Sequence, residues 1–288
     1  MPGDGGTDGM RGRVRLARGG AWWLAAGRCA GLAASLLLAV IASAQDNDPL
    51  APFLGTWSGV FTTQEDPYWG LEEFVCFVGC PAVARETLKA LLDDPANDER
   101  PFGDLMGQAI GAQNAEFSQI LTPLGRQIQA ENTGENDPKL LCQPYGFVRQ
   151  VTNPLPIAIS RNGEHLWVEY EEWSLLRPIF LDGRAHPQYR TPSLLGHSVG
   201  RVENGMLVVE TARVLPDRVS DFTQGGYSDE LTAVERYTVR DDPRRLELEL
   251  TITDPVTLTA PYVITKIWLA TPEVELVQDR CSEFPGKY

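Results

Sequence analysis

The C-terminal half of the chain alternates between apolar and polar positions, which is the pattern of half-buried β-strands. Between residues 246 and 253, leucine and isoleucine hold the even positions and glutamate and threonine the odd ones, so one face is predicted to point inward. Two Asn-Gly pairs, at 162–163 and 204–205, are typical of tight hairpin turns. About ten strands are predicted: 54–61, 156–160, 165–172, 175–181, the two arms of 196–213, 231–240, 246–253, 262–270 and 273–280.

The hairpin at 196–213 has the strongest local signal, and its register predicts which side chains share a face. With Asn204 and Gly205 as the loop, Glu203 faces Met206 across the two arms. Successive side chains point to opposite faces, so the arms have two distinct sides. One side carries His197, Arg201 and Glu210, and the other carries Val202, Leu207 and Val209. An ordinary solvent-facing side would contain the same residue types as the first set.

The region from 71 to 135 has a different pattern. Apolar residues recur at helical spacing in 82–92 and 102–128, with a polar loop between them and a break at Pro123. We interpret 71–135 as a helical insertion. It either covers the sheet as a lid or packs against it without a gating role.

These elements predict a mainly β fold. No long crossover helix separates the C-terminal strands, which excludes a parallel sheet. An antiparallel up-and-down meander can remove its exposed edges by closing on itself. We therefore predict a lipocalin-like barrel in a single domain over 45–288, with the helical insertion near its N-terminus.

The first 44 residues are predicted to be an export signal rather than part of the fold. Five arginines precede or flank the apolar run 30–41, which ends in the small residues Ala42-Ser43-Ala44. This pattern predicts cleavage before Gln45 and a location in the periplasm or outside the cell. The run is too short to span a bilayer and no later run reaches about 18 apolar residues, so the chain is not expected to be embedded in a membrane.

Net charge and the number of cysteines indicate which binding partners and covalent bonds to expect. The signal holds five arginines and two aspartates, so its removal takes the formal net charge from −14 to −17, which argues against nucleic-acid binding. Cys76, Cys80, Cys142 and Cys281 remain, an even number in an exported chain, and this predicts two disulfides. We predict the pairs Cys76–Cys80 and Cys142–Cys281. A metal site at Cys76 and Cys80 is the alternative.

Glu235 is the most informative single residue, because it falls on the apolar face of its strand. That face also holds Leu231, Ala233, Tyr237 and Val239. A carboxylate there must be paired or have a raised pKa, and either state suits a general acid or base. The alternative is a structural ion pair with an inward-facing arginine.

Two of the three histidines, His186 and His197, lie close together in the sequence. Imidazole is suited to proton transfer near neutral pH and is a common metal ligand. With Asp182 or Glu210 the pair could complete a two-histidine, one-carboxylate metal site, but the spacing matches no established motif. We therefore predict neither a metal nor another cofactor.

Four motifs stand out between Cys142 and Cys281: Cys142-Gln-Pro-Tyr-Gly, Asp182-Gly-Arg-Ala-His-Pro, Gly196-His-Ser-Val-Gly-Arg and Glu235-Arg-Tyr. With these motifs, this part of the chain resembles a family of uncharacterised exported bacterial proteins. The resemblance implies an exported protein but no settled activity. Tyr227 stands where the family usually has a third histidine, and Val202 where it has tryptophan, so a three-histidine metal centre would lack a ligand here.

We expect an exported barrel protein that binds a small apolar molecule in an internal cavity. The rival is a cofactor-independent isomerase, lyase or hydratase in which Glu235 abstracts a proton and His197 returns it. A third alternative is a structural envelope or interaction protein, and the oligomeric state stays open. Both of the first two expectations require His197 and Glu235 to face one enclosed space. The candidate ligand-binding residues are Tyr170, Asp182, Arg184, His186, Arg201, Glu210 and Tyr237.

Export is directly testable. Expressed in a secreting bacterial host, the chain is expected to lose its first 44 residues, because signal peptidase cleaves after small-x-small sequences. Intact-mass measurement and N-terminal sequencing of the purified protein should then begin at Gln45. A protein that retains Met1 in the cytoplasm of that host would contradict the prediction.

Overall fold

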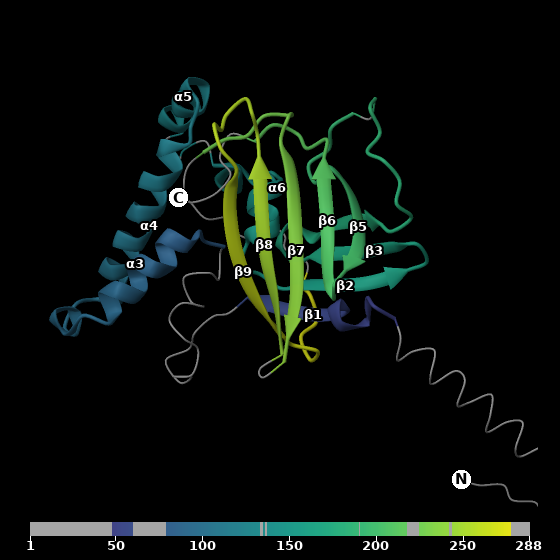
Figure 1. Ribbon diagram of the computed structural model, residues 1–288, viewed down its shortest axis with the longest axis horizontal. Coiled ribbons are helices and arrows are strands. Elements are labelled where there is room, and N and C mark those ends of the chain that lie inside the picture. The colour runs from purple at the N-terminus through teal and green to yellow at the C-terminus, as the bar shows by residue number, and fades with distance from the viewer. Residues whose placement is uncertain are drawn as a thin grey trace, which may run out of the picture. The chain divides into compact units, whose positions relative to one another are not determined.

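The computed structural model describes residues 48–59, 79–132, 135, 137–189, 191–217, 225–241 and 244–277. Its main feature is a closed barrel of nine strands whose order follows the chain (Figure 1). The strands are β1 (Gly55–Gly59), β2 (Ile157–Asn162), β3 (His165–Tyr170), β4 (Leu175–Phe180), β5 (His197–Glu203), β6 (Met206–Ala212), β7 (Thr232–Arg240), β8 (Arg245–Thr253) and β9 (Tyr262–Ala270). The predicted mainly β barrel is confirmed.

The barrel closes because β1 pairs with both β2 and β9. All neighbouring strands are antiparallel except β4 and β5, which are parallel, with Ile179 opposite Ser198. The purely antiparallel meander is therefore wrong at this one pair. Its cause is the connection 181–196, which replaces a hairpin and carries the chain back so that β5 runs in the same direction as β4.

The predicted hairpin register is confirmed. Glu203 lies opposite Met206 and His197 opposite Ala212, with both loop residues at positive φ, 51° for Asn204 and 79° for Gly205. These are the φ signs of a type I′ turn. The other turn differs from the expectation because its loop is Gly163-Glu164, and of these two only the glycine has a positive φ.

The predicted strand at 273–280 is wrong over its described part, 273–277, which holds turns and irregular backbone. The chain turns after β9, where the Val274 amide donates to the Thr271 carbonyl at 3.0 Å. Both edges of β9 are already paired, one with β8 and one with β1, so a tenth strand has no edge to join.

The described part of the insertion contains the predicted helices. They are α3 (Ala82–Leu92), α4 (Phe102–Gln119) and α5 (Pro123–Glu131), and α5 begins at the predicted proline break. The end of α4 contacts the barrel where the Phe117 ring packs edge-on against Tyr262, at 4.9 Å between centroids. In the part of the chain that is described, no helix has the length and apolarity needed to cross a membrane. The described residues also form four short 3₁₀ turns: η1 (Ala51–Phe53), η3 (Pro95–Asn97), η4 (Pro138–Leu141) and η5 (Glu172–Ser174).

A further helix, α6 (Phe147–Thr152), was not predicted. Five of its six residues are buried, and Phe147 belongs to the same core as the inward side chains of the strands. The Lys266 ammonium donates to the carbonyl oxygens of Thr152, at 3.1 Å, and Asn153, so it binds the C-terminal end of α6. Burial lowers the pKa of Lys266 well below its usual value.

The side chains themselves fill the barrel. Val209 of β6 and Leu246, Leu250 and Ile252 of β8 point inward, and each is 0% exposed. A space large enough for one water molecule beside any of them would appear as exposed surface. The described interior is therefore closely packed around these side chains, with no ligand-sized cavity beside them.

The inward and outward faces predict unequal effects of the same leucine-to-alanine change on stability. Leu250→Ala should lower the free energy of unfolding by about 2–5 kcal/mol, because it removes packed core atoms. Leu176→Ala is the matched control, since Leu176 is 52% exposed on β4, and it should change the value by less than about 0.5 kcal/mol. Urea unfolding measures both. Equal effects would contradict the assigned strand faces.

Candidate functional site

Glu235 lies inside the barrel, as its position on the apolar face predicts. Its side chain is 0% exposed and forms a two-bond ion pair with Arg177 of β4. The two guanidinium–carboxylate distances are 2.6 Å (Nη2 to Oε1) and 2.9 Å (Nη1 to Oε2). This is the structural ion pair with an inward arginine that the sequence left open as the alternative.

Four hydroxyl groups complete this set, which we call the interior network: Arg177, Glu235, Tyr170, Ser198, Thr211 and Tyr237. The remaining N–H groups of Arg177 donate to the hydroxyls of Ser198 (3.0 Å), Tyr170 (3.3 Å) and Thr211 (2.7 Å). The Tyr237 hydroxyl donates to Glu235 Oε2 at 2.7 Å. All five guanidinium donors therefore have acceptors within the protein.

The charges in the interior network hold its protons in place. Burial disfavours the charge on Arg177, but the Glu235 carboxylate keeps the pKa of Arg177 well above its usual value. Burial, reinforced by Glu235, also raises the pKa of Tyr237, and burial raises that of Tyr170. Both tyrosines are therefore neutral at ordinary pH, and Tyr237 is the one whose hydroxyl donates to Glu235.

His197 and Glu235 do not share an enclosed space, so that expectation is wrong. Ser198 faces inward and contacts Arg177, which places the preceding residue, His197, on the outer wall of β5. His197 is nevertheless 3% exposed, because the Phe180 ring stacks on it at 4.9 Å between centroids. The hairpin register was predicted correctly, but the face that points inward was not.

His186 covers the same imidazole from the connection 181–196. The Nδ1 atoms of His186 and His197 are 2.9 Å apart, so one ring donates and the other accepts. Burial lowers the pKa of His186, while Glu210 opposes this shift. Within the described residues, no group of three or more histidine, cysteine, aspartate or glutamate side chains is placed to hold a metal ion.

The other predicted ligand-binding residues divide between the two sides of the wall. Arg201 and Glu210 form a half-exposed ion pair on the outside, at 2.6 Å. Asp182 and Arg184 pair in the exposed connection, where the hydrogen bonds from Arg184 lower the pKa of Asp182 to about 2. Only Tyr170 and Tyr237 lie inside, in the interior network.

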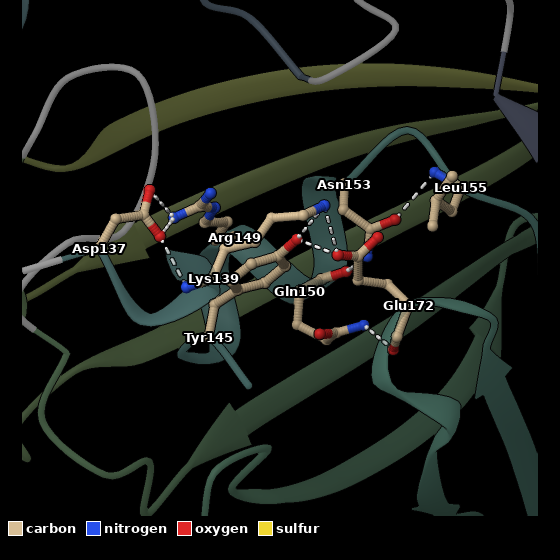
Figure 2. Close-up of polar contacts among 8 residues, drawn as sticks. All are labelled: Asp137, Lys139, Tyr145, Arg149, Gln150, Asn153, Leu155 and Glu172. Atoms are coloured by element: carbon tan, nitrogen blue, oxygen red, sulfur yellow. Dashed lines mark hydrogen bonds and ion pairs between the residues drawn. The ribbon is translucent and has the colours of Figure 1, made fainter. Parts of the chain in front are cut away.

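Sequence reasoning missed a second polar cluster, which lies where β3 turns into β4 (Figure 2). We call it the Glu172 corner, and its members are Lys139, Tyr145, Gln150, Glu172 and Trp173. Glu172 is 2% exposed, and its Oε1 accepts hydrogen bonds from the Tyr145 hydroxyl and, at 2.9 Å, from the Lys139 ammonium. Burial, and next the bond to Glu172, raise the pKa of Tyr145 well above its usual value, which makes this hydroxyl a donor.

The backbone at this corner is strained. Trp173 and Ser174 have φ angles of 64° and 48°, in the left-handed region that non-glycine residues rarely adopt. Each such residue costs about 1–3 kcal/mol, and the surrounding contacts must maintain it. One of these contacts is the hydrogen bond from Gln150 Nε2 to the Glu172 carbonyl, at 3.1 Å.

Two buried polar atoms at the same corner have no hydrogen-bond partner among the described residues. They are Gln150 Oε1, an acceptor, and Trp173 Nε1, a donor. Each such atom costs about 1–3 kcal/mol relative to a satisfied one, so native proteins contain few of them. The corner therefore combines a buried carboxylate, strained backbone and unused hydrogen-bonding capacity.

The only sequence signal for this corner was Tyr145, within the motif Cys142-Gln-Pro-Tyr-Gly. Glu172 was assigned to the end of a strand. Nothing in the local pattern distinguished it from the exposed Glu169 or the half-buried Glu171, because its burial depends on residues from another part of the chain.

No protein-family model, curated protein sequence or solved structure matches this chain. The resemblance to exported bacterial proteins therefore stays a prediction. Cys76 and Cys281 lie outside the described residues, so the disulfide pairs Cys76–Cys80 and Cys142–Cys281 stay predictions too, as does the alternative metal site.

The interior network predicts that its two charges depend on each other. Arg177→Met should lower the free energy of unfolding by about 3–5 kcal/mol, because it leaves the buried Glu235 carboxylate unpaired. Adding Glu235→Met should restore most of the loss. Arg201→Met, which breaks only the half-exposed pair with Glu210, is the control and should cost about 0–1 kcal/mol. Denaturant unfolding that ranks the two arginine variants equally would refute this interpretation.

Proposed function

We propose that this chain is an exported barrel protein that binds a small molecule at the Glu172 corner, with the packed barrel as its rigid support. The observation that carries the proposal is the pair of buried, unpartnered polar atoms, Gln150 Oε1 and Trp173 Nε1, beside strained backbone. A ligand that accepts one hydrogen bond and donates another would satisfy both atoms. Strain and unsatisfied groups of this kind concentrate at binding sites, where the ligand compensates their cost.

The aromatic side chains of the corner suit the apolar body of such a ligand. Tyr145 and Trp173 lie edge to face, with ring centroids 5.8 Å apart, and the Tyr145 ring is stacked against the Arg149 guanidinium at 4.1 Å. Small-molecule sites commonly combine apolar walls with a few placed polar groups. The proposal thus keeps the small, largely apolar ligand expected from the sequence and moves it out of the barrel interior.

Two rival sites receive less support. The interior network has all of its guanidinium donors occupied, and its surroundings are packed, so a ligand there would have to displace core side chains. An acid–base enzyme that uses Glu235 and His197 together would need both groups at one substrate, yet the barrel wall separates them.

Export itself rests on residues 1–44 and on the even number of remaining cysteines.

Trp173→Phe tests the proposal, because it removes the unpartnered N–H and keeps an aromatic ring. Without ligand, the free energy of unfolding should rise by about 1 kcal/mol. Stabilisation by ligands should fall. The measurement is a thermal scan with hexanol, hexanoate and hexylamine, together with native mass spectrometry of whatever co-purifies with the exported protein.

Trp167→Phe is the matched control, since Trp167 lies on the outer side of β3, away from the inward-facing Leu166 and Val168. It should leave ligand responses unchanged. If nothing co-purifies and no compound raises the melting temperature of either protein, the ligand-binding proposal fails and the structural envelope role becomes the better one.

A further inference from the structure

The two charged side chains of the Glu172 corner differ in their exposure to solvent. The Glu172 side chain is 2% exposed, whereas the side chain of its counter-ion, Lys139, is 54% exposed. The carboxylate is thus part of the protein interior, and the cation that neutralises it reaches in from the surface. Such a cation can be exchanged without unpacking the core, while the buried carboxylate cannot remain unpaired.

Lys139 can withdraw without loss of the turn that carries it. The turn η4 is held by Asp137, which accepts from the Lys139 backbone amide at 2.8 Å and pairs with Arg149 at 2.9 Å. These contacts use the backbone of Lys139 and not its ammonium group. Rotation of one side chain is therefore enough to uncover the Glu172 carboxylate.

The Lys139 ammonium group has two acceptors at this corner. Glu172 Oε1 and the Tyr145 hydroxyl oxygen both accept from it, at 2.9 and 3.4 Å (Figure 2). A carboxylate and a hydroxyl oxygen are suitable acceptors for the N–H donors of a primary ammonium group, and a carboxylate would repel an anionic ligand.

We propose that the Glu172 corner binds the primary ammonium end of an alkyl chain, and that Lys139 occupies this position as an intramolecular substitute. This rests on the function proposed above and names its ligand class. The four methylene groups of the lysine occupy the path that the ligand's alkyl chain follows. When the ligand binds, the Lys139 side chain moves into solvent. The ammonium group of the ligand then pairs with the Glu172 carboxylate in its place.

The tethered lysine competes with any free amine, because tethering gives it an effective concentration in the millimolar range or above. Removing it should therefore tighten amine binding. Lys139→Ala should bind hexylamine at least about tenfold more tightly than the unaltered chain. Adding Glu172→Gln should abolish that gain. Lys89→Ala is the matched control, since Lys89 has the same 54% exposure and pairs with Asp93 at 3.1 Å.

Isothermal titration of the purified chain and its variants provides the measurement, with hexylamine, hexanol, hexanoate and hexyltrimethylammonium as probes. The last has the charge but no N–H donors, so it should bind much more weakly than hexylamine. Lys139→Met, which keeps the bulk of the side chain, serves if Lys139→Ala fails to fold, and amines should then raise its melting temperature. Two further probes distinguish the source of the ammonium group: 1,5-diaminopentane represents a small amine, and N-acetyl-lysine amide represents a lysine of a protein. Binding of either probe supports the inference.

The outcomes separate the two proposals. If hexanol binds Lys139→Ala as tightly as hexylamine does, and Trp173→Phe weakens both, the ammonium inference fails and small-molecule binding at the corner stands. If Lys89→Ala gains as much amine affinity as Lys139→Ala, the amine effect is a general charge effect and the inference is overturned. If no probe binds any variant, the inference fails together with the site.

Discussion

The two-bond ion pair between Arg177 and Glu235 is the interaction on which the barrel interior depends. Each charge is almost completely removed from water, and each would be strongly destabilising without the other. The hydroxyls of Tyr170, Ser198 and Thr211 occupy the remaining guanidinium donors, which links β3, β4, β5 and β6 to β7 across the interior. All five guanidinium donors are thus used within the protein, and the network specifies how these strands meet.

The alternation of side chains across each strand explains which residues became structural and which remain accessible. Ser198 and Thr211 face the interior network, and their neighbours His197 and Glu210 face outward. The outer wall therefore carries the histidine pair and solvated ion pairs, while the inner wall carries apolar side chains, the interior network and the buried Lys266. Function on such a barrel belongs at its ends and connections, where backbone conformation is not dictated by strand pairing.

The Glu172 corner is a connection of that kind. Its strained residues and its unpartnered donor and acceptor lower stability, and the packed barrel below supplies the stability that tolerates them. Lys139 neutralises the buried carboxylate from a surface turn, so the corner is balanced in charge but open to exchange. Rigid support beneath a locally unfavourable site is the arrangement expected of a preorganised binding site.

The sequence by itself determined the barrel, the register of the hairpin at Asn204-Gly205 and the burial of Glu235, because alternation and turn chemistry act over neighbouring residues. Only the tertiary structure decided that the partner of Glu235 is Arg177, that β5 runs parallel to β4, and that His197 faces outward. Local sequence patterns also did not predict α6 or the Glu172 corner. A buried helix of six residues is too short to show helical periodicity in the sequence. The physical reason is common to all of these: alternation gives a strand two faces, but closure of the barrel chooses which of the two is enclosed.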